Sequence, residues 1–239
     1  MFPLTQLLPE LLALVVAKVE DGKNALRLTC RCLKQAVDAT TTQLTWRWMS
    51  CAPGYVDLTA ALGRISCPAL IHLRCGNLIT LTSLAGCPPG LRNLDFNNSG
   101  VASLAGCPPG LWRLECHATA VTSLAGCPPA LRRLDCSSTR LASLAGCPPS
   151  VRRLKCNNSG VASLEPLAAC AELEDLDCSD TGVSSLTALA GCPKLGKLII
   201  YGTRVEDLTP LESHKELSWY VRLDAMLYTD ACFARPCSY

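Results

Sequence analysis

Cysteine is the residue whose number and spacing in this chain could support the most chemistry. Seventeen of the 239 residues are cysteines, and eight of them recur in two series. The series are Cys87, Cys107, Cys127 and Cys147, and Cys116, Cys136, Cys156 and Cys178. Thiols at this density can build a disulfide framework or bind zinc. The odd total, the lack of a C-x-x-C pair and the supply of only one thiol per strand argue against both. We therefore expect reduced, structural thiols and no metal site.

Histidine, the usual acid–base residue, is too sparse to indicate catalysis. His72, His117 and His214 lie in separate parts of the chain. The sequence has no nucleophile elbow, phosphate-binding glycine loop or H-E-x-x-H motif. We predict that the protein is not an enzyme, has no catalytic residues and needs no cofactor.

The element that positions the cysteines is a repeat of 20 residues. The unit L-A-G-C-P-P-x-L/V-x-x-L-x-C/F-x-x-S/T-x-V/L-x-S begins at Leu84, Leu104, Leu124 and Leu144. Its apolar offsets of three and then two predict a short strand with one buried face, followed by a turn. The two prolines exclude an α-helix interior from the return path. Because no unit can bury its own inner face, the units must stack into a parallel sheet.

The unit L-x-x-L-x-C-x-x-S/T-x-V/L resembles the leucine-rich repeat, over about residues 70 to 217. Hydroxyl residues stand where that family usually has Asn, namely Ser99, Thr119, Thr139, Ser159, Thr181 and Thr203. The Pro-Pro return resembles the shortest repeat class. From Leu164 the spacing lengthens to 22 residues, which implies a short helical turn around residues 167–172. The implied fold class is α/β, a solenoid with a curved parallel β-sheet and a mostly extended convex side.

The N-terminal segment does not follow the repeat, and its apolar residues predict two short helices. Leu8–Leu12 (L-P-E-L-L) and residues 25–33 (A-L-R-L-T-C-R-C-L) resemble an F-box. The resemblance implies docking to the Skp-type adaptor of a cullin ubiquitin ligase. The candidate contacts are Pro9, Leu11, Leu12, Val15, Leu26, Cys30 and Leu33. The alternative is a plain helical cap that shields the first repeat.

These patterns divide the chain into four parts. We expect an F-box-like helical segment at 1–45, a linker or N-terminal cap at 46–69, leucine-rich repeats at 70–217, and a C-terminal cap and tail at 218–239. The apolar stretch from Leu7 to Val16 is interrupted by Pro9 and Glu10 and does not form a credible secretory signal. With reduced thiols, this predicts a cytoplasmic or nuclear protein. The sequence has no 18-residue apolar stretch, so we expect no membrane partner.

The concave face of the sheet is where a partner should bind, because residues on both sides of each inner Leu point outward there. Its charge is bipolar. Residues 91–160 contain eight basic and three acidic residues, a net charge of +5, and residues 161–180 contain six acidic residues and no Lys or Arg, a net charge of −6. We expect neighbouring opposite charges, such as Arg133 and Asp135, to pair. The candidate contacts are Trp112, Arg113, Glu115, His117, Arg133, Asp135, Arg153, Lys155, Asp175, Asp177 and Tyr201.

The sequence therefore predicts a protein–protein interaction module, acting as the substrate-recognition subunit of a cullin-type ubiquitin ligase. A leucine-rich-repeat scaffold or adaptor without a ubiquitin link is the alternative. Nucleic-acid binding ranks lower, because the basic stretch contains only one aromatic residue that could stack on bases, Trp112. The sequence does not name the protein target.

Overall fold

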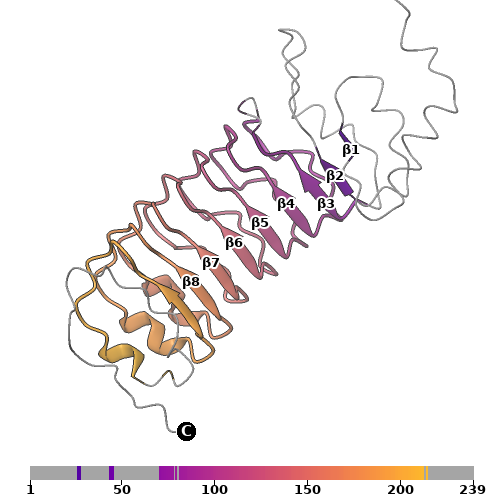
Figure 1. Ribbon diagram of the computed structural model, residues 1–239. Helices are drawn as coiled ribbons and strands as arrows, with labels where there is room; N and C mark the ends of the chain where they lie inside the picture. Colours follow the sequence, from indigo (N-terminus) through magenta and orange to yellow (C-terminus); the bar gives the residue numbers. More distant parts are fainter. Residues whose placement is uncertain are drawn as a thin grey trace, which may run out of the picture.

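A computed structural model of the chain describes residues 26–27, 43–45, 70–77, 79, 81–212 and 214. Within these residues, nine short strands form one parallel sheet in the order in which they occur in the chain (Figure 1). The strands are β1 (Leu26–Arg27), β2 (Gln43–Thr45), β3 (His72–Arg74), β4 (Asn93–Asp95), β5 (Arg113–Glu115), β6 (Arg133–Asp135), β7 (Arg153–Lys155), β8 (Asp175–Asp177) and β9 (Lys197–Ile199). The predicted repeat solenoid is confirmed.

The middle residue of each strand from β3 to β9 is a leucine that is almost completely buried. The strands are in register through this position, so that Leu114 pairs with Leu134 and Leu134 with Leu154. Burying one such side chain contributes roughly 1.5–3 kcal/mol. The stack of leucines, which we call the inner Leu column, is therefore one of the buried columns that stabilise the array.

A tight turn follows each of the strands β4 to β9, and hydroxyl residues hydrogen-bond its backbone. Thr139 Oγ1 donates to the carbonyl of Cys136 at 2.7 Å, and Thr119 and Thr181 make the same bond in their own repeats. The residue before each hydroxyl residue has a left-handed backbone, with φ of 53° at Ser138. Ser99 is the exception, because its buried Oγ has no hydrogen-bond partner among the described residues.

The return path is extended in the 20-residue repeats, as the prolines predict. It begins in a tight turn, in which Cys107 N donates to the Leu104 carbonyl at 3.0 Å. The later and longer repeats carry 3-10 helices instead, on the side of the array away from the sheet (Figure 1). These are η3 (Glu165–Ala169), η4 (Thr187–Gly191) and η5 (Thr209–Leu211). Among the described residues, no helix is long and apolar enough to cross a lipid bilayer.

The two cysteine series differ in burial. Cys116, Cys136, Cys156 and Cys178 are buried and free, and form a ladder beside the inner Leu column. Cys116 Sγ donates to the Asp135 carbonyl at 3.2 Å, and Cys136 Sγ donates to the Lys155 carbonyl at the same distance. The second series, from Cys87 to Cys147, is only half-buried and packs against the edge of the core. All eleven described cysteines are free thiols.

The N-terminal segment departs from the sequence prediction where the structure describes it. Leu26–Arg27 is a strand and not part of a helix, and it pairs in parallel with Gln43–Thr45. The backbone register pairs Leu26 with Leu44 and Leu44 with Leu73. The alternation of Leu26 and Leu28 is as compatible with a strand as with a helix. The rest of the predicted helical segment lies outside the described residues.

The hydroxyl residues provide a matched test of the turn. Thr139→Val keeps the side-chain shape but removes the donor to the Cys136 carbonyl, so the free energy of unfolding should fall by about 1–2 kcal/mol. Ser99→Ala removes a buried hydroxyl that has no partner, so it should change stability by less than about 0.5 kcal/mol or increase it. Urea unfolding followed by circular dichroism measures both. Equal losses in the two variants would contradict this account of the turn.

The half-buried thiols should make stability fall at high pH. Burial raises the pKa of Cys107 and of Cys127 from the ordinary value of 9.0 to about 12. Below pH 9 the thiols are neutral in both the folded and unfolded states, and between pH 9 and about 12 only the unfolded chain ionises, so folding loses stability there. Urea unfolding should show that the slope of the free energy of unfolding against pH is shallower by up to about 1.4 kcal/mol per pH unit between about pH 9.5 and 10.5 for each thiol replaced by Ala, and is unchanged between about pH 7.5 and 8.5. An unchanged slope in Cys107→Ala would show that this thiol ionises freely in the native protein.

Candidate protein-binding surface

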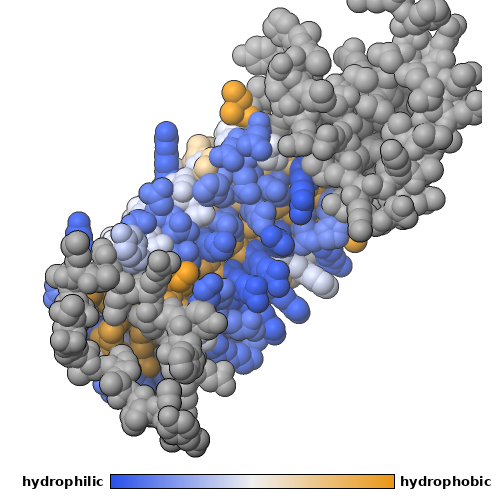
Figure 2. Space-filling view, in the orientation of Figure 1, coloured by the Kyte–Doolittle hydropathy of each residue, from blue (hydrophilic) through white to orange (hydrophobic). Residues whose placement is uncertain are grey.

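The outward side chains of strands β3 to β9 form one solvent-facing surface, which we call the sheet face. It holds all eight charged strand residues that the sequence singled out. They are Arg113 and Glu115 on β5, Arg133 and Asp135 on β6, Arg153 and Lys155 on β7, and Asp175 and Asp177 on β8. Figure 2 shows hydrophilic side chains gathered in a band along the middle of the array. The residues that stand 20 or 22 positions apart in sequence are thus neighbours on this surface.

Opposite charges pair on the sheet face, both within and between strands. Arg113 Nε donates to Glu115 Oε1 at 2.8 Å, two residues further along β5. Lys197 on β9 lies 4.0 Å from Asp175 on β8. Each exposed pair contributes at most about 1 kcal/mol. These pairs set the positions of side chains more than they stabilise the fold.

The predicted pair between Arg133 and Asp135 does not form. Asp135 Oδ1 instead accepts a hydrogen bond from the backbone N–H of Ser137 at 3.2 Å, and from the Ser137 hydroxyl, while Asp135 Oδ2 lies 3.8 Å from Lys155 Nζ. The Asp side chain is one methylene shorter than the Glu of the preceding repeat, so it caps the local turn more readily than it reaches back along its strand. Arg133 is consequently left without an ion pair among the described residues.

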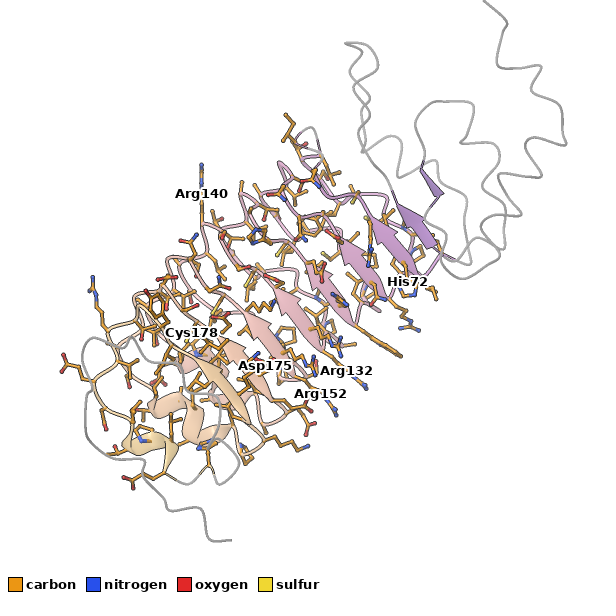
Figure 3. All side chains as sticks on the ribbon, viewed as in Figure 1. His72, Arg132, Arg140, Arg152, Asp175 and Cys178 are labelled. Atoms are coloured by element: carbon orange, nitrogen blue, oxygen red, sulfur yellow. The ribbon has the colours of Figure 1, made fainter. Side chains whose placement is uncertain are left out.

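A second column of residues lies beside the sheet face, immediately before the strands, and the sequence prediction missed most of it. This edge column consists of Arg92, Trp112, Arg132 and Arg152, joined by backbone hydrogen bonds from each residue to the preceding one. Arg132 and Arg152 lie side by side in Figure 3, and Arg140 projects from the opposite edge. Trp112 was named as a candidate contact, but its arginine neighbours were not. Their common position in the repeat was the signal that could have found them.

The edge column is organised around Trp112, which is 49% exposed. The guanidinium carbons of Arg92 and Arg132 each lie 5.4 Å from the centroid of the Trp112 ring, one from the repeat before and one from the repeat after. Arg152 is bound differently, because its two terminal nitrogens contact Glu172 at 3.1 Å and Glu174 at 3.2 Å. All four residues therefore contact side chains of neighbouring repeats along the array.

The residues that follow the strands include His117 and Tyr201, both predicted contacts. Tyr201 is 44% exposed at the C-terminal end of the array. His117 Nδ1 lies 3.0 Å from the Ser137 hydroxyl, which itself donates to Asp135. In a nucleophilic triad the histidine stands between the serine and the carboxylate, whereas here the serine stands in the middle. This trio therefore holds the turn and does not activate a nucleophile.

A shallow hollow marks the N-terminal part of the sheet face, between β3, β4 and β5. It is lined by His72, Arg74, Asn93, Asp95, Arg113 and Glu115, together with two inner leucines. Burial, reinforced by Arg74, lowers the pKa of His72, whose ring contacts Asn93. Burial raises the pKa of Asp95. Among the described residues, no three His, Cys, Asp or Glu side chains converge in a way that could hold a metal ion.

The predicted adaptor contacts are not brought together in the described part of the chain. Pro9, Leu11, Leu12, Val15, Cys30 and Leu33 lie outside the described residues, and Leu26 belongs to strand β1. The F-box-like surface therefore stays a prediction from sequence.

Comparison with solved structures defines the class of fold. Internalin InlF from Listeria monocytogenes str. 4b F2365 superposes with a TM-score of 0.66 at 16% identity, covering 82% of this chain and 57% of that chain. Internalin C2 from the same strain gives 0.61 at 21% identity, covering 90% and 93%. The leucine-rich-repeat domain of APL1B gives 0.61 at 19% identity, covering 93% and 71%. No family model and no curated protein sequence matches the chain.

The described residues thus form a leucine-rich-repeat-like parallel β-solenoid. At these levels of identity the likeness establishes the fold alone. The chain spans little more than half of the length of the InlF structure.

The ion pairs of Arg152 provide a test of how charge is arranged across the repeats. Arg152→Glu would place three carboxylates together with Glu172 and Glu174, so the free energy of unfolding should fall by about 1 kcal/mol at low salt. Arg133→Glu should not lower the free energy of unfolding, because the new carboxylate would lie between the basic strand neighbours Arg113 and Arg153. Urea unfolding at two salt concentrations separates these effects, since added salt should shrink the loss in Arg152→Glu. A salt-independent loss would assign Arg152 a packing role.

Proposed function

We propose that this chain is a protein-interaction module that binds a partner protein on its sheet face. The observation that carries the proposal is that outward side chains lie at fixed, repeated positions on the sheet. Several of these charged side chains form no ion pair with another described residue of the chain. Arg133 and Arg153 belong to this group, since neither has an ion pair among the described residues. A surface built from aligned rows of exposed side chains suits an extended protein contact more than a small molecule.

The geometry of the site supports this class of function over catalysis. The hollow at β3 to β5 is shallow, and His117, Ser137 and Asp135 are arranged to cap a turn. Exposed Trp112 and Tyr201 add the aromatic side chains that commonly anchor protein interfaces. The likeness to leucine-rich-repeat structures also supports a binding role, and the absence of catalysis stays a prediction.

A more specific proposal makes this module the substrate-recognition subunit of a cullin-type ubiquitin ligase. It is supported by the F-box-like sequences of Leu8–Leu12 and residues 25–33, in which Leu11 and Leu12 are the central adaptor contacts. The strand at Leu26–Arg27 counts against a second F-box helix and favours the alternative, in which the N-terminal segment only caps the array. The free thiols of the repeats support a reducing compartment, the cytoplasm or the nucleus.

Reciprocal variants of the full chain test both levels of the proposal. Arg133→Glu with Arg153→Glu should abolish capture of target proteins from a lysate of the source cells, and should retain a purified Skp-type adaptor. Leu11→Asp with Leu12→Asp should lose the adaptor and retain the targets. Quantitative mass spectrometry reads the targets, and biolayer interferometry reads the adaptor.

A matched control uses Arg140→Glu with Arg204→Glu, which makes the same charge change at the turn after the strands. This variant should retain both the targets and the adaptor. If the wild-type chain does not bind the adaptor, the ubiquitin-ligase proposal is wrong and the scaffold reading stands. If the target set is the same in both arginine double variants, the binding surface is not the sheet face.

A further inference from the structure

The edge column adds a feature that a generic protein-binding face does not require. Arg92 and Arg132 come from the repeats on either side of Trp112, and each guanidinium lies over the indole ring at 5.4 Å from its centroid. A stacked guanidinium is held in one orientation but keeps its N–H donors at the edge of its plane. The column thus presents Arg132 as an ordered donor group, with little conformational entropy left to lose on binding.

Part of the positive charge that has no ion pair lies in or beside this stack. Arg113, Arg152, Lys155, Lys194 and Lys197 each pair with an acidic residue of the chain. Arg132, Arg133 and Arg153 have no acidic partner among the described residues. All three belong to the adjacent strands β6 and β7 or to the turns that lead into them. Three guanidiniums of two adjacent repeats therefore lack carboxylates among the described residues, and one of them, that of Arg132, stacks on the exposed Trp112.

We propose that this cluster, Trp112 with Arg132, Arg133 and Arg153, binds an acidic segment of the partner protein. The inference rests on the proposed function and names the chemistry of the partner at the middle of the sheet face, next to β5, β6 and β7. Carboxylates of the segment would accept paired N–H donors from the arginines, the geometry in which guanidinium and carboxylate bind best. An apolar side chain of the segment would cover the exposed edge of Trp112.

The same geometry disfavours a single-stranded nucleic acid as the occupant. Bases bind such surfaces by stacking on an open aromatic face. Both neighbours of Trp112 in the column already place a guanidinium over its ring. The cluster can still attract phosphate groups by charge, so nucleic acid and anionic lipid are the competing outcomes of the test.

Fluorescence anisotropy of a fluorescein-labelled peptide of Glu-Glu-Leu repeats tests the proposal on the full chain. The wild type should bind this peptide at least about tenfold more tightly than the Gln-Gln-Leu counterpart, and added salt should weaken binding. Arg132→Glu with Arg133→Glu should weaken binding by about tenfold or more, and Trp112→Ala by about threefold to tenfold. The control, Arg140→Glu with Arg204→Glu, makes the same change in net charge and should bind like the wild type. Circular dichroism melting identifies any variant that fails to fold, and the comparison of the two peptides needs no variant.

Three results would overturn the proposal. These are equal binding of the Glu and Gln peptides, equal weakening in the two arginine double variants, or tighter binding of oligothymidine or phosphatidylserine vesicles than of the acidic peptide. If target capture still depends on Arg133 and Arg153, the proposed function stands even when one of these three results is found. Loss of that dependence would remove the proposed function itself, and this inference with it.

Discussion

The pairing of each three-residue strand with the strands of the two neighbouring repeats is the interaction on which the whole structure depends. A strand this short cannot satisfy its backbone or bury its leucine alone, and neighbouring strands provide both at a spacing of about 4.8 Å. The inner Leu column is the result. Because the register is fixed through Leu114, Leu134 and Leu154, every other position of the repeat also becomes a column. The thiol ladder, the turn hydroxyls and the edge column all follow from this constraint.

Residues of like charge in one column repel each other, which destabilises the fold. In this chain, neighbouring side chains reduce that repulsion. Arg92 and Arg132 are separated by the aromatic ring of Trp112, which attracts both. Arg152, the next member, is held by two glutamates from the following repeat. The relief is incomplete at Arg132 and Arg133. The charge that remains there is available to another molecule.

Sequence periodicity was enough to predict the parts of the fold that repeat. The inner position of Leu134 and Cys136, the hydroxyl bond of Thr139 and the extended return all follow from spacing and residue type. Features that occur only once in the chain were harder to predict. The apolar residues from Leu26 onward fit both the alternation of a strand and the period of a helix. The pairing of Leu26 with the distant Leu44 selects the strand. The Asp135 carboxylate accepts a hydrogen bond from the Ser137 backbone N–H, because its side chain is one methylene shorter than that of Glu115. The contacts of Trp112 required knowing which side chains share a column, and this depends on the register of the folded array.

The near identity of successive repeats has a consequence for how the protein can change over evolutionary time. Residues 101–109, 121–129 and 141–149 differ at only two positions of the unit, and their backbones stack without a change of register. A duplication or loss of one unit in the gene would therefore insert or remove a complete strand, turn and return, leaving the joins on either side intact. The surface that contacts a partner can therefore be lengthened by one complete repeat at a time. Selection can then change an exposed residue in the new repeat without disturbing the buried packing beneath it.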